Sequence, residues 1–70
     1  MNDEDFPRRL FGEIKDSQGQ TIPVQADYTG INDDGLKVFI CRIPKAFWVV
    51  SMSWDQMPAQ SILQMEVDDR

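Results

Sequence analysis

Residues 21–28 alternate between apolar and polar side chains, with Ile22, Val24, Ala26 and Tyr28 on one side. Successive side chains of a β-strand point to opposite faces of its sheet, so a period of two is typical of a strand with one buried face. The pattern therefore predicts a strand over residues 21–28.

Pro23 lies inside this predicted strand. Proline has no backbone N–H and cannot donate a hydrogen bond to a neighbouring strand, so within sheets it is confined to edges and bulges. We therefore expect the strand to lie at a sheet edge or to bulge locally.

The middle of the chain is the richest in aromatic and β-branched residues, which favour strands. Residues 36–43 and 46–54 predict two strands of a central hairpin, separated by Pro44 and Lys45. Neither predicted strand has a polar face. Since contiguous apolar surface is seldom left in water, both faces must be covered by further strands, by closure of a barrel or by a partner.

The segments 6–15 and 56–67 fit both a strand and a short helix. Helical spacing of apolar residues competes with alternation in each of them, and Asp5 could cap a helix over the first. Gly12 weakens that helix, and a strand there would form a hairpin with residues 21–28. A strand is the preferred interpretation of both segments.

Five short strands separated by turn residues predict a mainly β protein. We expect a small five-stranded barrel-like or strongly bent antiparallel sheet of the SH3-like or OB-like kind, with one short helix at the N- or C-terminal end as the alternative. The expected organisation is a flexible acidic N-terminus over residues 1–5, a single β-rich domain over residues 6–67 and an acidic tail over residues 68–70.

A chain of 70 residues buries only about 60% of the surface that its unfolded form exposes, so its stability must be small. Cys41 is the single cysteine and cannot form an intramolecular disulfide. Small domains that lack disulfides often gain stability by association, and a homo-oligomer is therefore an open alternative.

The net charge is −5, although residues 36–54 contain three basic residues and no acidic one. An acidic chain is poorly suited to sequence-independent binding of nucleic acid or of a membrane surface, and it favours basic protein partners. No apolar run reaches the length of a membrane span, and residues 1–5 lack the positive charge of a signal peptide. Together with the single thiol, this predicts a cytoplasmic protein.

The chain contains no histidine, which removes the commonest general base and the commonest metal ligand. It has no glycine-rich phosphate loop and no paired cysteine ligands. Cys41 lies among apolar residues of a predicted strand, where burial makes a thiol inert. We therefore expect a protein that is not an enzyme and that has no cofactor and no metal site.

Aromatic and basic side chains of the central segment form the first candidate binding surface. They are Phe39, Trp48 and Trp54, with Arg42 and Lys45. The competing interpretation is that these rings fill the core, because adjacent residues of a strand point to opposite faces and cannot all share one surface.

Asp27, Asp33 and Asp34 form the second candidate, an acidic surface for a basic partner. Carboxylates are also the ligands that Ca²⁺ prefers, but the alternating spacing of a calcium loop is absent here. Solvated charge in a turn is the competing interpretation.

These features predict a small non-catalytic protein–protein interaction module, acting as an acidic regulator or inhibitor of a basic partner protein. The alternative is a module that binds single-stranded nucleic acid or a nucleotide through residues 36–54, with aromatic rings stacking on bases and cations following the phosphates.

Overall fold

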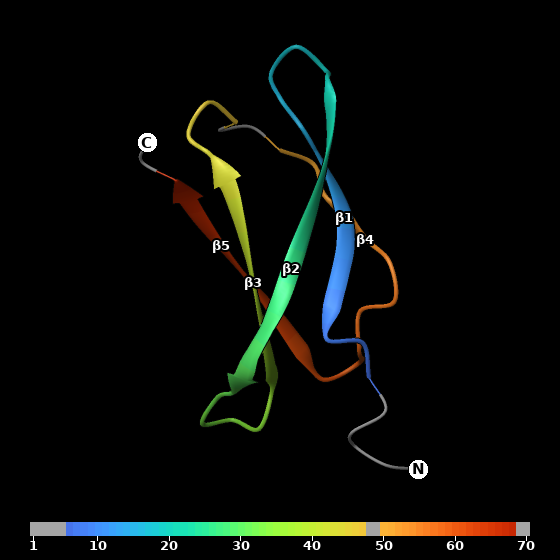
Figure 1. Ribbon diagram of the computed structural model, residues 1–70, viewed down its shortest axis with the longest axis vertical. Helices are drawn as coiled ribbons and strands as arrows, with labels where there is room; N and C mark the ends of the chain where they lie inside the picture. Colours follow the sequence, from blue (N-terminus) through green and yellow to red (C-terminus); the bar gives the residue numbers. More distant parts are fainter. Residues whose placement is uncertain (1–5, 48–49, 69–70) are drawn as a thin grey trace.

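The computed structural model describes residues 6–47 and 50–68, and within these it contains five strands and no helix (Figure 1). The strands are β1 Arg9–Lys15, β2 Thr21–Ile31, β3 Lys37–Pro44, β4 Ser53–Trp54 and β5 Ser61–Asp68. The strand interpretation is thus confirmed for both ambiguous segments. The predicted flexible residues 1–5 and residues 69–70 of the predicted tail lie outside the described residues.

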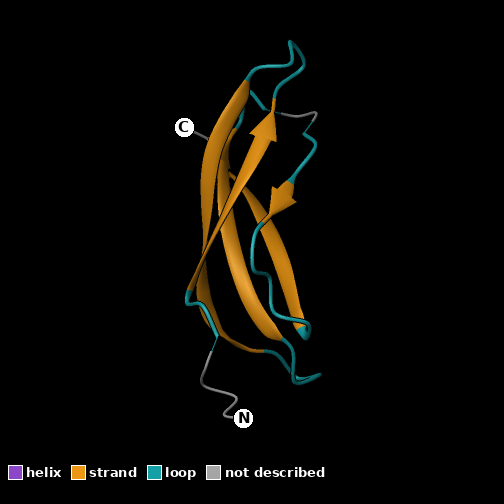
Figure 2. Cartoon of the chain, turned by 90° about the vertical axis from the view of Figure 1, so that its right-hand side faces the viewer, coloured by secondary structure: helices purple, strands orange, loops and turns teal. Residues whose placement is uncertain are grey.

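The five strands form one curved sheet in the order β4-β1-β2-β3-β5 (Figure 2). The pairs β1/β2, β1/β4 and β2/β3 are antiparallel, whereas β3 and β5 are parallel. The prediction of a mainly β fold with five strands is confirmed, but the sheet is mixed rather than wholly antiparallel. It also keeps two edges, β4 and β5, and is not closed into a barrel.

The predicted central hairpin of residues 36–43 and 46–54 is wrong. The neighbours of β3 are β2 and β5, which cover both of its edges. Among the described residues of the predicted second strand, only those of β4 form a strand, and β4 pairs with β1 at the opposite side of the sheet. The chain leaves β3, crosses to β4 and returns to β5, because a parallel neighbour requires a long crossover connection.

The inner face of the sheet carries the hydrophobic core. Register places Leu10 opposite Ala26 and Ala26 opposite Cys41, so alternate residues of the three central strands share this face. The buried hydrophobic side chains are Leu10, Ile14, Ala26, Phe39, Cys41 and Ile43. The alternation at residues 21–28 therefore predicted the inward face of β2 correctly.

An aromatic cluster closes one end of this core. The ring of Tyr28 lies 4.9 Å from that of Phe6 and 5.6 Å from that of Phe39, measured between centroids. The guanidinium of Arg8 lies over the Phe6 ring at 4.3 Å. Tilted and edge-on ring pairs of this kind add about 0.5–1.5 kcal/mol each beyond the area that they bury.

Gly12 allows β4 to approach β1 closely. It pairs with Trp54, and a Cβ atom at Gly12 would lie 2.6 Å from both Ser53 O and Trp54 Cδ2. Such distances are far shorter than van der Waals contact. The absence of a side chain at this position thus lets the half-buried indole lie directly against the β1 backbone.

We expect Gly12→Ala to destabilise the protein by about 1–3 kcal/mol, as overpacking typically does. Urea denaturation followed by tryptophan fluorescence measures this cost. Emission of the native state should also move to longer wavelength, because the added methyl displaces Trp54 towards water.

Gly35→Ala is the matched control. Gly35 has a φ of 81° with nothing near its Cβ position, so an alanine there introduces backbone strain of about 1–2 kcal/mol without touching an indole. The native emission of this variant should be unchanged. Unchanged emission in Gly12→Ala would contradict the role given to the glycine.

Candidate binding groove on the outer face

β2 and β3 separate partway along their lengths, as Figure 1 shows. Their pairing ends at Ala26 and Cys41, although β2 begins at Thr21 and β3 runs to Pro44. If the same register continued, Pro23 would lie opposite Pro44. Neither residue has a backbone N–H, so this pair can form no ladder hydrogen bond. The two prolines therefore account for the split.

The separated half of β2 keeps a neighbour on one side only. The Tyr28 N–H donates to Arg8 O at 3.0 Å, which shows that even-numbered residues of β2 direct their backbone groups to β1. Odd-numbered residues direct theirs to the other side. The backbone groups of Thr21, Pro23 and Gln25 consequently point towards the split. Pro23 is expected at a sheet edge or at a local bulge. β2 is a central strand, but at Pro23 it has a described strand on one side only.

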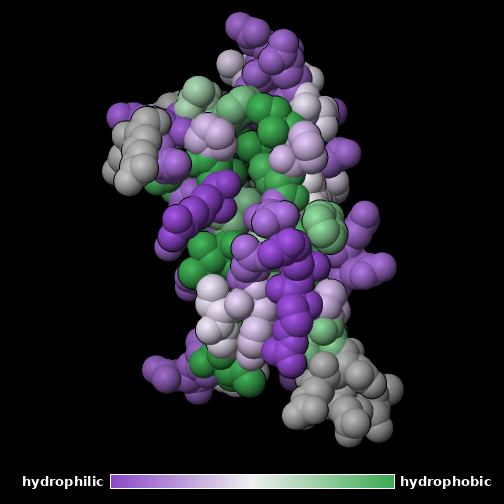
Figure 3. All heavy atoms as spheres, viewed as in Figure 1, coloured by the Kyte–Doolittle hydropathy of each residue, from purple (hydrophilic) through white to green (hydrophobic). Residues whose placement is uncertain are grey.

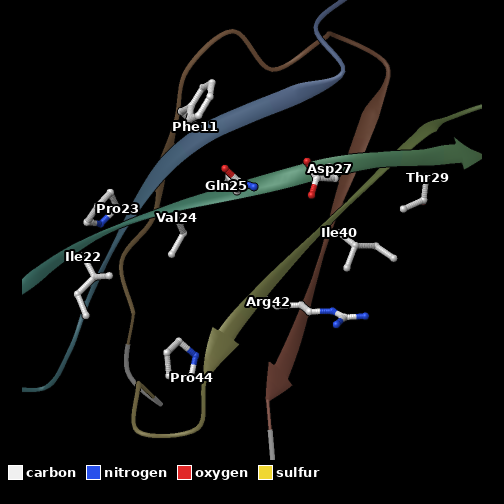
Figure 4. Close-up of a pocket in the computed structure, with 10 residues that line it drawn as sticks. All are labelled: Phe11, Ile22, Pro23, Val24, Gln25, Asp27, Thr29, Ile40, Arg42 and Pro44. Carbon is white, nitrogen blue, oxygen red and sulfur yellow. The ribbon is translucent and has the colours of Figure 1, made fainter.

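A groove of about 880 Å³ occupies the split and continues onto the outer face of the sheet (Figure 4). Its lining residues come from β1, β2 and β3. They are Phe11, Ile22, Pro23, Val24, Gln25, Asp27, Thr29, Ile40, Arg42 and Pro44. Figure 3 shows hydrophobic surface exposed in a hollow on this side of the molecule. The volume lies within the range of about 300–1,000 Å³ that is typical of ligand sites.

Phe11 is the aromatic residue among those that line the groove. It projects from β1 opposite Gln25 of β2, and 61% of its surface is accessible. Ile22, Val24 and Ile40 are half-buried around the split. Contiguous exposed apolar surface of this kind marks interaction sites in soluble proteins.

Two exposed ion pairs lie on the outer face. Arg9 Nε is 2.9 Å from Asp27 Oδ1, and Arg42 Nε is 3.4 Å from Glu66 Oε2. Exposed pairs contribute only about 0–1 kcal/mol to stability. Their effect here is electrostatic: the cations and carboxylates largely cancel, and the groove presents an apolar surface with little net charge.

The residues of the predicted aromatic and basic surface do not lie together in the structure. Phe39 is completely buried on the inner face, where no partner of the folded chain can touch it. Trp54 is half-buried and packs on the core, and Trp48 lies outside the described residues. Arg42 lines the groove, and Lys45 is exposed in the turn after β3. Of the described residues of this aromatic and basic surface, only Arg42 therefore belongs to the groove.

The predicted acidic surface is divided as well. Asp27 lines the groove, whereas Asp33 and Asp34 are exposed in the turn that joins β2 to β3. That turn is organised by Asn32, whose Oδ1 accepts hydrogen bonds from the N–H groups of Asp34 and Leu36 at 2.9 Å each. It lies at the paired end of β2 and β3, away from the split.

Sequence reasoning did not identify Phe11 or the split as a site. The available signal was the pair of prolines, one inside the predicted strand 21–28 and one directly after the predicted strand 36–43. Their significance depends on the register, because only the pairing of Ala26 with Cys41 places Pro23 and Pro44 at the same level.

Cys41 has no exposed surface and lies on the inner face of β3. Burial raises the pKa of its thiol, because the charged thiolate is poorly solvated there. No group of three or more potential metal-ligating side chains occurs in the described part of the chain. Within the same residues, no helix long and apolar enough to cross a membrane is found.

Comparisons with models of protein families, with curated proteins and with solved structures found no match to this chain.

We expect the Cys41 thiol to resist a thiol-reactive dye in the native protein and to react quickly after unfolding in urea. Because folding raises the pKa of the thiol, the stability that the neutral thiol provides is intact below the unfolded pKa of about 8.5 and declines as the pH rises above it. Denaturation at several pH values checks this. Cys41→Ala should lack that decline, and rapid labelling of the native protein would contradict the assignment.

Proposed function

We propose that the chain is a non-catalytic protein–protein interaction module that binds an extended, largely apolar segment of a partner protein in the groove between β2 and β3. The observation that carries this proposal is the interrupted β2/β3 ladder. It combines a concave apolar surface with a row of backbone groups on β2 that face the split, where no described strand pairs with them.

An extended segment suits both features of the groove. Its main chain can hydrogen-bond to the backbone groups that Thr21 and Gln25 direct towards the split, as in other cases of strand addition. Its apolar side chains can pack against Phe11 and the half-buried residues of the floor. Pro23 and Pro44 supply apolar rings but no donors, so side-chain packing contributes more to binding than a continuous hydrogen-bond ladder does.

The acidic charge of the chain favours a basic partner. The net charge is −5, and Asp33 and Asp34 add exposed carboxylates at the far end of β2 and β3. Long-range attraction of this kind raises the rate of encounter more than the final affinity, and salt weakens it. In this proposal the protein acts as an acidic regulator or inhibitor whose groove provides the specific contact.

The geometry gives less support to binding of single-stranded nucleic acid or a nucleotide. Base stacking requires exposed rings beside free cations. Phe39 is buried, Arg42 is paired with Glu66, and the exposed Phe11 lies near Asp27 in a groove of balanced charge.

The side chains of the groove also give little support to a catalytic function. The chain has no histidine, and Cys41 lies on the inner face without exposed surface. The carboxylate that lines the groove, Asp27, accepts a hydrogen bond from Arg9 at 2.9 Å. This carboxylate is already engaged in an ion pair, which is why we propose binding rather than chemistry.

We expect Phe11→Ala to weaken binding of peptides selected on the native protein from a random display library. A loss of about tenfold corresponds to removal of one aromatic anchor at the centre of a site. Titration followed by fluorescence polarisation of a labelled peptide measures it. Because Phe11 is exposed, stability should change by less than about 0.5 kcal/mol.

Ile31→Ala is the matched control, because Ile31 is 63% exposed at the far end of β2, away from the groove. Its affinity for the peptide should equal that of the native protein. Equal losses in both variants, or failure to select any peptide, would refute the proposed site.

A further inference from the structure

β5 forms one edge of the sheet in the described part of the chain. It contains eight residues, pairs with β3 on one side and has no described strand on the other. Edge strands are usually blunted by charged side chains, above all lysine, or by proline, a bulge or shortness, because an open edge can pair with another chain. β5 contains no proline, lysine or glycine, its two charged residues, Glu66 and Asp68, lie near its C-terminal end, and its register with β3 is regular from Ser61 to Asp68. The opposite edge, β4, is only two residues long.

The backbone N–H and C=O groups of successive residues in β5 point alternately to β3 and to the open edge. The Lys37 N–H donates to Gln60 O at 3.0 Å, so even-numbered residues along β5 direct their backbone groups to β3. Odd-numbered residues direct theirs outward. They are Ser61, Leu63, Met65 and Val67.

The side chains of these outward residues are incompletely covered. Leu63 and Met65 are half-buried at the margin of the core, and Val67 is 49% exposed. They share the inner face, because register places Leu63 beside Phe39 and Met65 beside Cys41. A strand added at this edge would complete their cover.

We infer that two copies of the chain associate through their β5 edges, in antiparallel register about a twofold axis at Gln64. Leu63 of one copy then lies opposite Met65 of the other, and Ser61 lies opposite Val67. All four residues with outward backbone groups meet one another in this register, and each contact occurs twice. The two inner faces join into one continuous apolar surface.

The edge is complementary to itself in charge as well as in hydrogen bonding. In this register Glu66 lies opposite Ile62 of the other copy, and Gln64 lies opposite Gln64. Like charges directly opposite would be destabilising. A twofold axis at Glu66 would bring the two Glu66 side chains together, so the arrangement about Gln64 is favoured. A second copy thus matches this edge in register, polarity and length.

The association is separate from the groove. β5 lies beyond β3, and its free edge points away from the split between β2 and β3. A dimer therefore leaves both grooves open, and the two proposals can fail independently. Since each copy carries a charge of −5, added salt should strengthen the dimer by screening the repulsion.

Cross-linking of Gln64→Cys tests the register. Paired residues whose backbone groups point away from each other have Cα atoms about 4.5 Å apart, within the range of about 4.4–6.8 Å that a disulfide spans. In a glutathione redox buffer this variant should form a covalent dimer, detected by non-reducing electrophoresis and intact mass. The native Cys41 is buried and does not compete.

Gln25→Cys is the matched control, an exposed glutamine on the outer face of β2. It should give only a background of random cross-links. Cross-linking of Gln64→Cys at that background level would overturn the inference.

Light scattering over a concentration series tests the hydrogen bonding of the edge in the native protein. Val67→Pro removes an outward N–H and leaves the β3/β5 ladder intact, so it should shift the monomer–dimer equilibrium at least tenfold towards monomer. Val67→Ala keeps the N–H and should dimerise more strongly than Val67→Pro. A native protein that stays monomeric at every concentration, or equal dimerisation of the two variants, would overturn the inference. Phe11→Ala should dimerise like the native protein.

Discussion

The absence of a backbone donor at two facing positions shapes this molecule. Pro23 and Pro44 would meet if the β2/β3 register continued beyond Ala26 and Cys41, and proline cannot complete such a pair. The strands separate at this level. β2 continues with β1 alone and β3 continues with β5 alone, which leaves an opening in the middle of a sheet rather than at its margin.

The hydrophobic core is small, and partly buried side chains around it add to the packing. Six described hydrophobic side chains are buried, and half-buried residues from β2, β4, β5 and the loops pack around them. Two local features extend this packing: the aromatic cluster beneath Arg8 closes one end, and Gly12 lets Trp54 lie close against β1. Stability in so short a chain comes from contacts between distant segments, because no helix provides local hydrogen bonds in the described residues.

The two proposed binding surfaces use different physical properties. The groove offers concave apolar surface with nearly balanced charge and suits a segment of another protein. The β5 edge offers a regular row of backbone groups and suits a copy of itself. The exposed acidic turn at Asp33 and Asp34 belongs to neither surface and acts on partners only through the long-range field.

The sequence was enough to predict the strands that have a clear alternation, the absence of histidine chemistry and the buried state of Cys41, because these follow from local pattern and composition. It also marked Pro23 as a break in a ladder. It could not determine that β3 pairs in parallel with β5, that Phe39 faces the core, or that Phe11 lines a groove. Those features depend on which strands become neighbours and in which register, and a strand with two apolar faces fits several partners equally well until the whole chain has packed.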